Sequence, residues 1–314
     1  MRLLVVADRA GDVPAPARAA DVAAAWRDTH PGDEVATLAL ADGGAGLLDA
    51  IAGPSDTWLT TEAAGPHGHP VEAAVLLRAD GTAVVEAARV ASAAVAPDGR
   101  VDVQFATTYG VGELVQAALD TGAHRVAVGV AGVAAVDGGA GALTGMGFRL
   151  RVADGSGLKI GVADLDRVRT VERGWAEVPD DLEVVVLADT DAALAQAAAA
   201  LQHAGEVDAA MHEQIAAALA AWGPVAERDL DAAGAAGRDG AGAGGGLAFG
   251  LAAALHAVIR PAVEVVAGWQ GLDPALAAAD GVLVAAAPDG PVHRYVTDRA
   301  VAAGVPVVPG PPGA

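Results

Sequence analysis

Two strand-like segments of this chain each run into the same turn, Asp-Gly-Gly-Ala-Gly, and then into an apolar helical segment. The first turn spans Asp42–Gly46 after Glu34–Leu40, and the second spans Asp137–Gly141 after Arg125–Val130. A strand that enters a helix through a glycine turn is the repeating unit of an α/β fold with a parallel sheet. Such a turn also presents backbone N–H groups at the positive end of a helix, where phosphate and carboxylate bind. The repeat therefore predicts an α/β architecture and a site for a small anion.

Each turn by itself has a second interpretation. The chain contains 41 glycines, and a glycine turn also forms simply because glycine adopts positive φ at little cost. Both interpretations stay open for either turn alone, whereas the repetition of the five-residue turn favours an anion site.

The segment that precedes the second turn predicts a helix of its own. Apolar residues between Leu114 and Leu119 recur at helical spacing, and Gly122 follows where a helix end is expected. Thr107 and Thr108 stand at the start of this helix. Their hydroxyl groups either cap the helix or face a ligand.

The rest of the chain alternates strand-like and helix-like segments. Further strands are expected at Leu3–Ala7, Glu72–Leu77, Thr82–Glu86, Leu182–Leu187, Gly281–Ala285 and Val305–Val308. Helices are expected at Ala17–Arg27, at Asp191–Trp222 with a break near Gly205, and at Leu247–Ile259, Pro274–Ala279 and Val292–Ala303. The Gly/Ala stretch Asp231–Gly246 is typical of either a phosphate-binding loop or a flexible linker.

Composition narrows the function classes. The formal net charge is −21, from 40 acidic and 19 basic residues, so nucleic acid and anionic membranes are not expected partners. The absence of cysteine excludes disulfides and thiolate chemistry. No apolar run approaches the ~18 residues of a membrane helix, and the N-terminus lacks a signal-peptide pattern, so a soluble cytoplasmic protein is expected. Motifs of serine hydrolases, Walker nucleotide sites and dinucleotide sites are lacking, which argues against hydrolases and dehydrogenases.

His67 and His69 are the histidines that fall close together in the sequence. They lie in Gly65–Pro70, whose glycine and proline content is typical of a turn. Two histidines without neighbouring carboxylates make a poor metal site, so the turn is the favoured interpretation. Metal ligands stay unassigned.

Together these segments resemble the glycerate kinase family, whose members carry ADGGEGT near the N-terminus, TTYGVGEL in the middle and GGSATNDGG beyond it. The match is close at Thr107–Leu114 and continues at Leu3–Asp8, Gly81–Glu86 and Asp280–Val284. The resemblance implies phosphorylation of glycerate to phosphoglycerate by ATP with Mg²⁺. It also implies two α/β domains. One would be flavodoxin-like and built from residues 1–62 and 262–314, and residues 63–261 would form the inserted domain.

The resemblance also suggests site residues. Aspartates that follow strands are the catalytic candidates: Asp8, Asp42 and Asp137. Turn and hydroxyl groups are the candidates for substrate binding: Gly43, Gly44, Thr107, Thr108, Gly138 and Gly139. The turn before Leu247 is the candidate for nucleotide binding: Gly244, Gly245 and Gly246. Each aspartate has the alternative role of capping the helix that follows it.

Several polar positions of the family motifs are apolar in this chain. Gly11 stands in place of the lysine of the family's PDSFKGS loop, so Arg9 or Arg18 would have to supply the charge, with a different geometry. The other replaced positions are Ala45, Leu47, Val133, Ala135, Val136 and Ala287. Removing one hydrogen bond to a ligand costs about 1–3 kcal/mol. Two hypotheses follow, a divergent glycerate kinase or a catalytically degenerate homologue that binds a small anion or regulates a partner, and the oligomeric state is left open.

Overall fold

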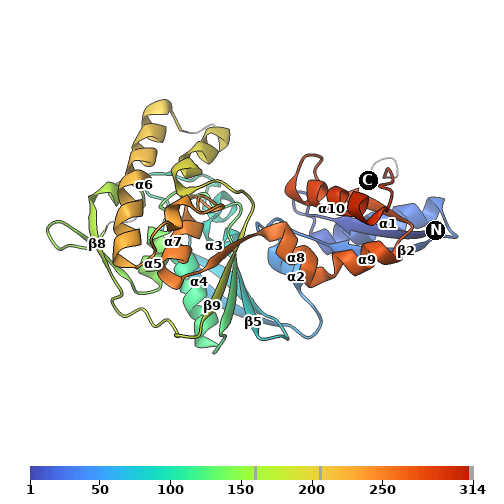
Figure 1. Ribbon diagram of the computed structural model, residues 1–314, viewed down its shortest axis with the longest axis horizontal. Helices are drawn as coiled ribbons and strands as arrows, with labels where there is room; N and C mark the ends of the chain where they lie inside the picture. The colour runs from blue at the N-terminus through green and yellow to red at the C-terminus, as the bar shows by residue number, and fades with distance from the viewer. Residues whose placement is uncertain (159–160, 205–206, 311–314) are drawn as a thin grey trace. The chain divides into compact units, whose positions relative to one another are not determined.

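The computed structural model describes residues 1–158, 161–204 and 207–310. The chain divides into two compact units, which we describe separately (Figure 1). The terminal unit contains residues 1–53 and 262–314, and the inserted unit contains residues 54–261. Each unit carries strands of a parallel or mixed sheet with helices, so the expected α/β class is confirmed. Among the described residues, none of the helices has both the length and the apolar character needed to cross a membrane.

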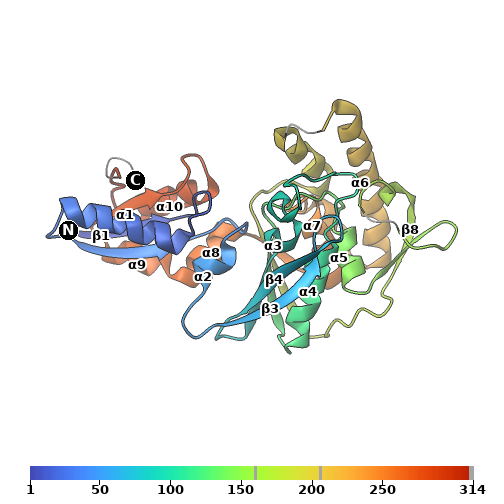
Figure 2. The same cartoon turned by 180° about the vertical axis from the view of Figure 1, so that it is seen from behind.

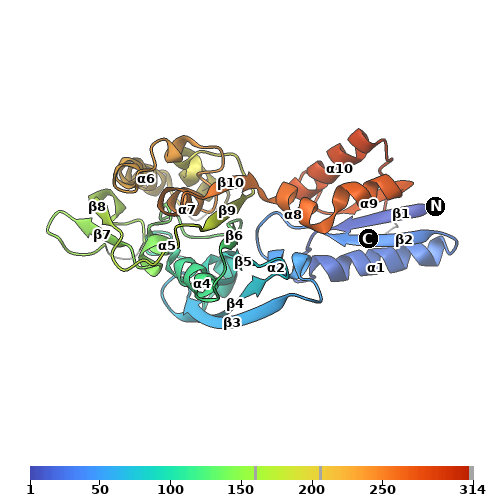
Figure 3. The same ribbon diagram turned by 60° about the horizontal axis from the view of Figure 1, so that its bottom comes forward.

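The terminal unit is built on a parallel sheet with the strand order β11-β1-β2. Its strands are β1 (Arg2–Ala7), β2 (Glu34–Ala39) and β11 (Gly281–Ala285). Its helices are α1 (Ala15–Thr29), α2 (Leu47–Ile51), α8 (Ala262–Gln270), α9 (Leu272–Ala278) and α10 (Pro291–Ala303). Helix α1 lies on one face of the sheet, and α9 and α10 lie on the other (Figure 3). Both faces of β1 are therefore covered, which explains why five of its six residues are buried.

Strand β1 is the middle strand of this sheet. The next strand of the sheet along the chain lies on one side of β1, and the last strand lies on the other side. The β1–α1–β2 crossover places β2 beside β1, and the chain's last strand, β11, pairs with the opposite edge of β1. Ligands of open parallel sheets bind at the carboxyl ends of the strands, where the strand order reverses in this way. Residues 8–14, 40–46 and 286–290 form the loops at that edge.

The inserted unit contains a mixed sheet with the strand order β10-β9-β6-β5-β4-β3. Its strands are β3 (Thr57–Ala64), β4 (Pro70–Leu77), β5 (Thr82–Glu86), β6 (Arg125–Gly129), β9 (Glu183–Ala188) and β10 (Val258–Pro261). Strands β5, β6, β9 and β10 are parallel, whereas β3 and β4 form an antiparallel hairpin that packs on α4, Tyr109–Asp120 (Figure 2).

Further elements surround this sheet. The α-helices are α3 (Ala88–Ala91), α5 (Ala140–Gly145), α6 (Ala209–Asp229) and α7 (Leu247–Leu255). A two-stranded sheet pairs β7 (Arg149–Val152) with β8 (Val168–Glu172). The 3₁₀ segments are η1 (Ala93–Val95), η2 (Leu165–Arg167), η3 (Leu194–Ala204) and η4 (Ala235–Gly237). The core of the unit centres on apolar residues of the sheet, α4 and α7.

The first boundary between the units differs from the expected one. The expected break near residue 62 falls inside β3, which pairs with β4 over its whole length, including Glu62 opposite Glu72. The strand therefore belongs to the inserted unit, and the division lies between Gly53 and Pro54. The second division falls between Pro261 and Ala262.

The expected helix Leu247–Ile259 is wrong in its last turn. Helix α7 ends at Leu255, His256 adopts the left-handed conformation with φ 52, and Ile259 lies in β10 beside β9. A short buried apolar run has the same composition in a helix and in a parallel strand, so periodicity does not separate them.

Two other expected elements also change. The expected helix end at Trp222 is wrong, because α6 continues to Asp229 with Pro224 inside it. The expected break near Gly205 lies outside the described residues. The expected strand Val305–Val308 is reduced to an isolated parallel bridge between Val307 and Val282.

Candidate functional site

Asp8 and Asp42 lie at the carboxyl edge of the sheet in the terminal unit. Asp8 directly follows β1, and its N–H group donates to Ala285 O at 3.1 Å. Asp42 follows β2, whose pairing with β1 continues through a hydrogen bond from Leu40 N to Ala7 O at 2.9 Å. Parallel pairing thus carries two aspartates from different strands to one edge. The structure places these two catalytic candidates at the same edge of one sheet, whereas Asp137 belongs to the other unit.

The environment of Asp8 disfavours its charge. Burial raises the pKa of Asp8 to about 6, and the neighbouring charge of Asp42 adds to the rise. A hydrogen bond from Arg9 N to Asp8 Oδ1 at 2.7 Å and the cations of Arg18 and Arg9 oppose it. A carboxyl group with a pKa near 6 is ionised at neutral pH and is a far better proton acceptor than an exposed aspartate.

The first glycine turn wraps around the Asp42 side chain. The N–H group of Gly44 donates to Asp42 Oδ1 at 3.0 Å, and Gly43 and Gly46 adopt φ of 90 and 88. Gly46 also lies under the side chain of Arg9, because a Cβ at Gly46 would stand 3.3 Å from Arg9 Cδ. The loops after β1 and β2 therefore touch through Arg9 and Gly46.

Asp137, the third catalytic candidate, lies in the inserted unit and is fully buried. It accepts hydrogen bonds from Thr107 Oγ1 at 3.3 Å, Thr108 N at 2.8 Å and Thr108 Oγ1 at 2.9 Å. It also accepts from Gly139 N at 3.0 Å and Gly141 N at 3.2 Å. Burial raises the pKa of Asp137, and the hydrogen bonds oppose that rise. Its carboxylate thus joins the start of α4 to the start of α5.

The second glycine turn is occupied by the chain itself. The Gly138 N–H group donates to Gly245 O at 3.1 Å, and Gly138 O accepts from Trp222 Nε1 at 3.0 Å. A Cβ at Gly138 would stand 2.6 Å from Trp222 Cδ1, and one at Gly139 would stand 2.8 Å from Gly250 Cα. The anion that the turn holds in this structure is the Asp137 carboxylate.

The segment Thr107–Leu114 uses its glycines for close packing. A Cβ at Gly110 would stand 1.9 Å from Ala64 O of β3, and one at Gly112 would stand 2.1 Å from Ala142 O of α5. The Glu113 carboxylate accepts from Ala64 N at 2.7 Å. Thr107 and Thr108 are buried with Asp137 rather than open to solvent. In this structure the motif binds α4 to β3 and to α5.

A pair of glycine substitutions in helices tests this packing role. Gly112→Ala is expected to lower the free energy of unfolding by about 1–3 kcal/mol, because the new methyl group forces α4 away from the α5 backbone. Gly268→Ala in α8 is the matched control: no atom lies within 4 Å of its Cβ position, and replacing a helical glycine stabilises by up to about 1 kcal/mol. Thermal unfolding of both variants should shift in opposite directions. A Gly112→Ala protein as stable as the wild type would contradict the packing role.

The glycine stretch before α7 packs against the carboxyl edge of the inserted sheet. Gly242 N donates to Ala192 O at 2.7 Å, and Ala241 and Ala243 are buried, so the linker interpretation is wrong. Gly244 and Gly245 are half-buried with φ of 59 and 64. Within residues 1–158, 161–204 and 207–310, no acceptor is found for the N–H groups of these two glycines. They are backbone donors that an anion could use.

The donor set limits which metal would fit. No group of three or more histidine, cysteine and acidic side chains that could hold a metal occurs in the described part of the chain. His69 Nε2 lies 2.9 Å from Val95 O, and His67 Nε2 accepts from Asp102 N at 3.1 Å. Both ring nitrogens are thus engaged with the backbone. The Asp42 carboxylate suits Mg²⁺, which takes one or two carboxylates with water and phosphate oxygens as its other ligands.

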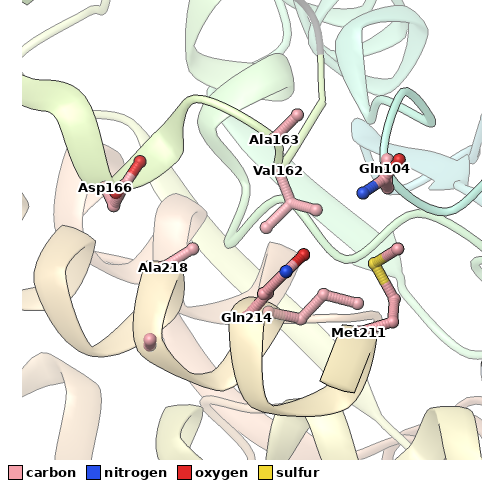
Figure 4. Close-up of a pocket in the computed structure, with 9 residues that line it drawn as sticks. Gln104, Val162, Ala163, Asp166, Met211, Gln214 and Ala218 are labelled. Carbon is pink, nitrogen blue, oxygen red and sulfur yellow. The ribbon is translucent and has the colours of Figure 1, made fainter. Parts of the chain in front are cut away.

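A separate cavity of about 300 Å³ lies in the inserted unit, between the start of α6 and the loops near Gln104 and Val162 (Figure 4). The polar groups on its wall are the carboxamides of Gln104 and Gln214 and the carboxylate of Asp166. These residues are not predicted from the sequence, because nothing in their spacing indicates that they share a cavity. None of the candidate site residues lines it.

Comparison with known proteins gives consistent matches. The sequence profile of the Glycerate kinase family matches residues 4–309. The chain is 30% identical over 249 residues to Glycerate kinase of Bacillus subtilis (strain 168), an alignment that covers 77% of this chain and 64% of the relative. It is 30% identical over 153 residues to Glycerate 2-kinase of Escherichia coli (strain K12), covering 47% and 39%. The matched part thus spans less than two thirds of the length of these relatives.

A solved structure resembles the whole chain. The crystal structure described as glycerate kinase 2 from Salmonella typhimurium LT2 superposes with a TM-score of 0.85 at 27% identity. The match covers 98% of this chain and 86% of that chain.

Proposed function

Because the chain belongs to the Glycerate kinase family, we propose that it transfers the terminal phosphoryl group of ATP to a hydroxyl group of glycerate. The observation that carries this proposal is the pair Asp8 and Asp42 at the carboxyl edge of β1 and β2. There a carboxyl group with a pKa of about 6 stands beside a second carboxylate. Phosphoryl transfer needs such groups to orient a hydroxyl and to hold a metal ion.

The proposed reaction assigns the proton to Asp8. The glycerate hydroxyl oxygen forms the new bond to the γ-phosphorus, and the bond from that phosphorus to the bridging oxygen of ADP breaks. The hydroxyl proton passes to the Asp8 carboxylate, which is ionised at neutral pH because its pKa of about 6 lies below 7. The raised pKa makes Asp8 a stronger base than an exposed aspartate would be.

Asp42 is the proposed carboxylate ligand of Mg²⁺, which leaves the Asp8 carboxylate to accept the proton. When bound, the ion would neutralise phosphate charge in the transition state. Asp42 Oδ1 is held by Gly44 N at 3.0 Å, so the turn fixes the orientation of the carboxylate. In this proposal Gly43 and Gly44 do not touch glycerate themselves; their turn orients the Asp42 carboxylate that would bind the metal ion.

In the inserted unit we propose two different roles. The N–H groups of Gly244 and Gly245, followed by Gly246 at the start of α7, would receive phosphate oxygens of the nucleotide. Asp137 with Thr107 and Thr108 would act indirectly, because the three side chains are buried and bonded to one another. Gly138 and Gly139 would likewise act by allowing close packing rather than by touching glycerate.

The alternative raised by the motif losses, a degenerate homologue that binds but does not transfer, is not favoured by the comparisons. The family profile covers nearly the whole chain, and relatives over much of it are named glycerate kinases. The apolar positions Ala45 and Val133 remain departures from the family pattern, so turnover decides between the two hypotheses.

Production of ADP from ATP tests the proposal. The purified protein with MgCl₂, ATP and glycerate should form ADP in a coupled assay well above the rate without glycerate. Chromatography should show phosphoglycerate in equal amount. A rise in melting temperature on addition of glycerate, with no ADP formed, would support the degenerate alternative. If the protein forms no ADP and glycerate does not shift its melting temperature, both hypotheses are overturned.

A further inference from the structure

Two arginines lie at the carboxyl edge of the terminal sheet beside Asp8. The cations of Arg9 and Arg18 both lower the pKa of that carboxyl group, so both lie within electrostatic range of it. Arg18 Nη1 donates to Asp8 O at 3.3 Å, and the Arg9 side chain crosses Gly46 at the start of α2. The two guanidinium groups thus approach the Asp8–Asp42 edge from the loop after β1 and from α1.

Neither guanidinium group forms an ion pair with a carboxylate within the described residues. Arg9 donates from its side chain to Gly11 O, and Arg18 donates to Asp8 O. Arginine has five N–H donors, so most donors of each remain available. This is notable in a chain with 40 acidic residues, where Arg2 and Arg299 pair with aspartates at 2.6 Å.

Arg18 stands at a position that costs stability. It lies in the first turn of α1, which has no side-chain cap and no acidic residue there. A cation at the N-terminal end of a helix opposes the helix dipole. A charged residue that opposes the helix dipole and has no ion-pair partner is expected where a ligand compensates for its cost.

We propose that Arg9 and Arg18 form an anion-binding pair that receives a carboxylate or phosphoryl group of a substrate at the Asp8–Asp42 edge. The pair would replace the lysine of the family loop, whose position is Gly11 here. Two planar guanidinium groups can each hold two oxygens of such a group, which a single ammonium does not do. This proposal rests on the proposed function for the identity of the substrates.

Charge-removing variants test the pair. Arg9→Gln with Arg18→Gln is expected to raise KM for one substrate at least tenfold, and the substrate affected, glycerate or ATP, identifies the anion. Arg27→Gln is the matched control: it removes the same charge from the C-terminal end of α1, where Arg27 donates to Val35 O, and should change KM less than twofold. The melting temperature of the double variant should change little, because removing the unfavourable interaction of Arg18 with the helix dipole offsets the lost attraction of both cations for the Asp8 carboxylate.

Restoring the family lysine gives a second test. Gly11→Lys in the Arg9→Gln background should recover part of the lost affinity, because no atom lies within 4 Å of the Gly11 Cβ position. The positive φ of 55 at Gly11 is tolerated by other residues at a modest cost.

Ligand-dependent melting separates this inference from the proposed function. Glycerate, inorganic phosphate and MgATP are titrated separately against wild type, the double variant and Arg27→Gln. Loss of a wild-type shift only in the double variant supports the pair even without turnover. If the KM values and the ligand-induced shifts in melting temperature of the double variant equal those of the wild type, the proposed arginine pair is overturned while the kinase proposal stands. A wild type that neither turns over nor shifts with any of these ligands overturns both.

Discussion

Replacing Asp8 by asparagine is expected to lower kcat for glycerate phosphorylation by about 10²–10⁴-fold, the range for loss of a general base, while making the protein more stable at neutral pH. Asparagine keeps the shape and an oxygen that accepts from Arg9 N, so the fold should be retained. It removes a charge that burial and Asp42 both disfavour. The gain in stability does not depend on the proposed activity, so it tests the geometry separately.

The pH dependence follows from the direction of the Asp8 pKa. Its folded value of about 6 lies above the unfolded value of about 3.9, so the folded state binds more protons between these values. Its contribution to stability is therefore largest below pH 4 and is lost as the pH rises through 6. The difference in melting temperature between Asp8→Asn and wild type should be near zero at pH 4 and largest above pH 7.

Activity should show the complementary trend. Because the ionised form of Asp8 accepts the proton, kcat/KM of the wild type should fall as the pH drops through about 6. Asp42→Asn should move this fall to lower pH in whatever activity remains, since it removes a charge that raises the pKa of Asp8. Exposed Asp28 on α1 is a control position, and Asp28→Asn should leave both profiles unchanged. An Asp8→Asn enzyme with wild-type kcat would remove Asp8 from the mechanism.

Replacing Asp137 by asparagine is expected to lower the free energy of unfolding of the inserted unit by about 1–3 kcal/mol for each buried donor that is left without an acceptor. The melting temperature of that unit should then fall on the order of 10 °C. All five groups bonded to Asp137 are donors, and an asparagine NH₂ group would face some of them without an acceptor.

The threonines give a graded series for the same network. Thr108→Val should cost more stability than Thr107→Val, because Thr108 Oγ1 donates to Asp137 at 2.9 Å and accepts from Ala142 N at 3.0 Å. The Thr107 hydroxyl is 3.3 Å from the carboxylate. Calorimetry of the variants gives the ranking. An Asp137→Asn protein with wild-type stability but no turnover would instead favour a direct catalytic role for Asp137.

The sequence by itself determined the strand-to-helix units and the residues that end them. Strand-like runs before Asp8, Asp42 and Asp137 predicted α/β architecture, because alternation, turn glycines and apolar periodicity are local properties. The resemblance carried by Thr107–Leu114 added the family, and the profile match over residues 4–309 confirms it. Edge strand β3 and the end of α7 were missed or misplaced, since their identity depends on pairing with β4 and β9.

Only the tertiary structure decided what each candidate residue touches. Asp42 and Asp137 stand in identical Asp-Gly-Gly-Ala-Gly turns, yet Asp42 is partly exposed at a sheet edge and Asp137 is fully buried. The difference arises because Thr107 and Thr108, which directly precede α4, donate hydrogen bonds to Asp137, and Trp222 of α6 covers Gly138. Burial and hydrogen-bond partners come from segments distant in the chain. The same five-residue sequence can therefore leave its aspartate partly exposed at a sheet edge in one unit and join the starts of two helices in the other.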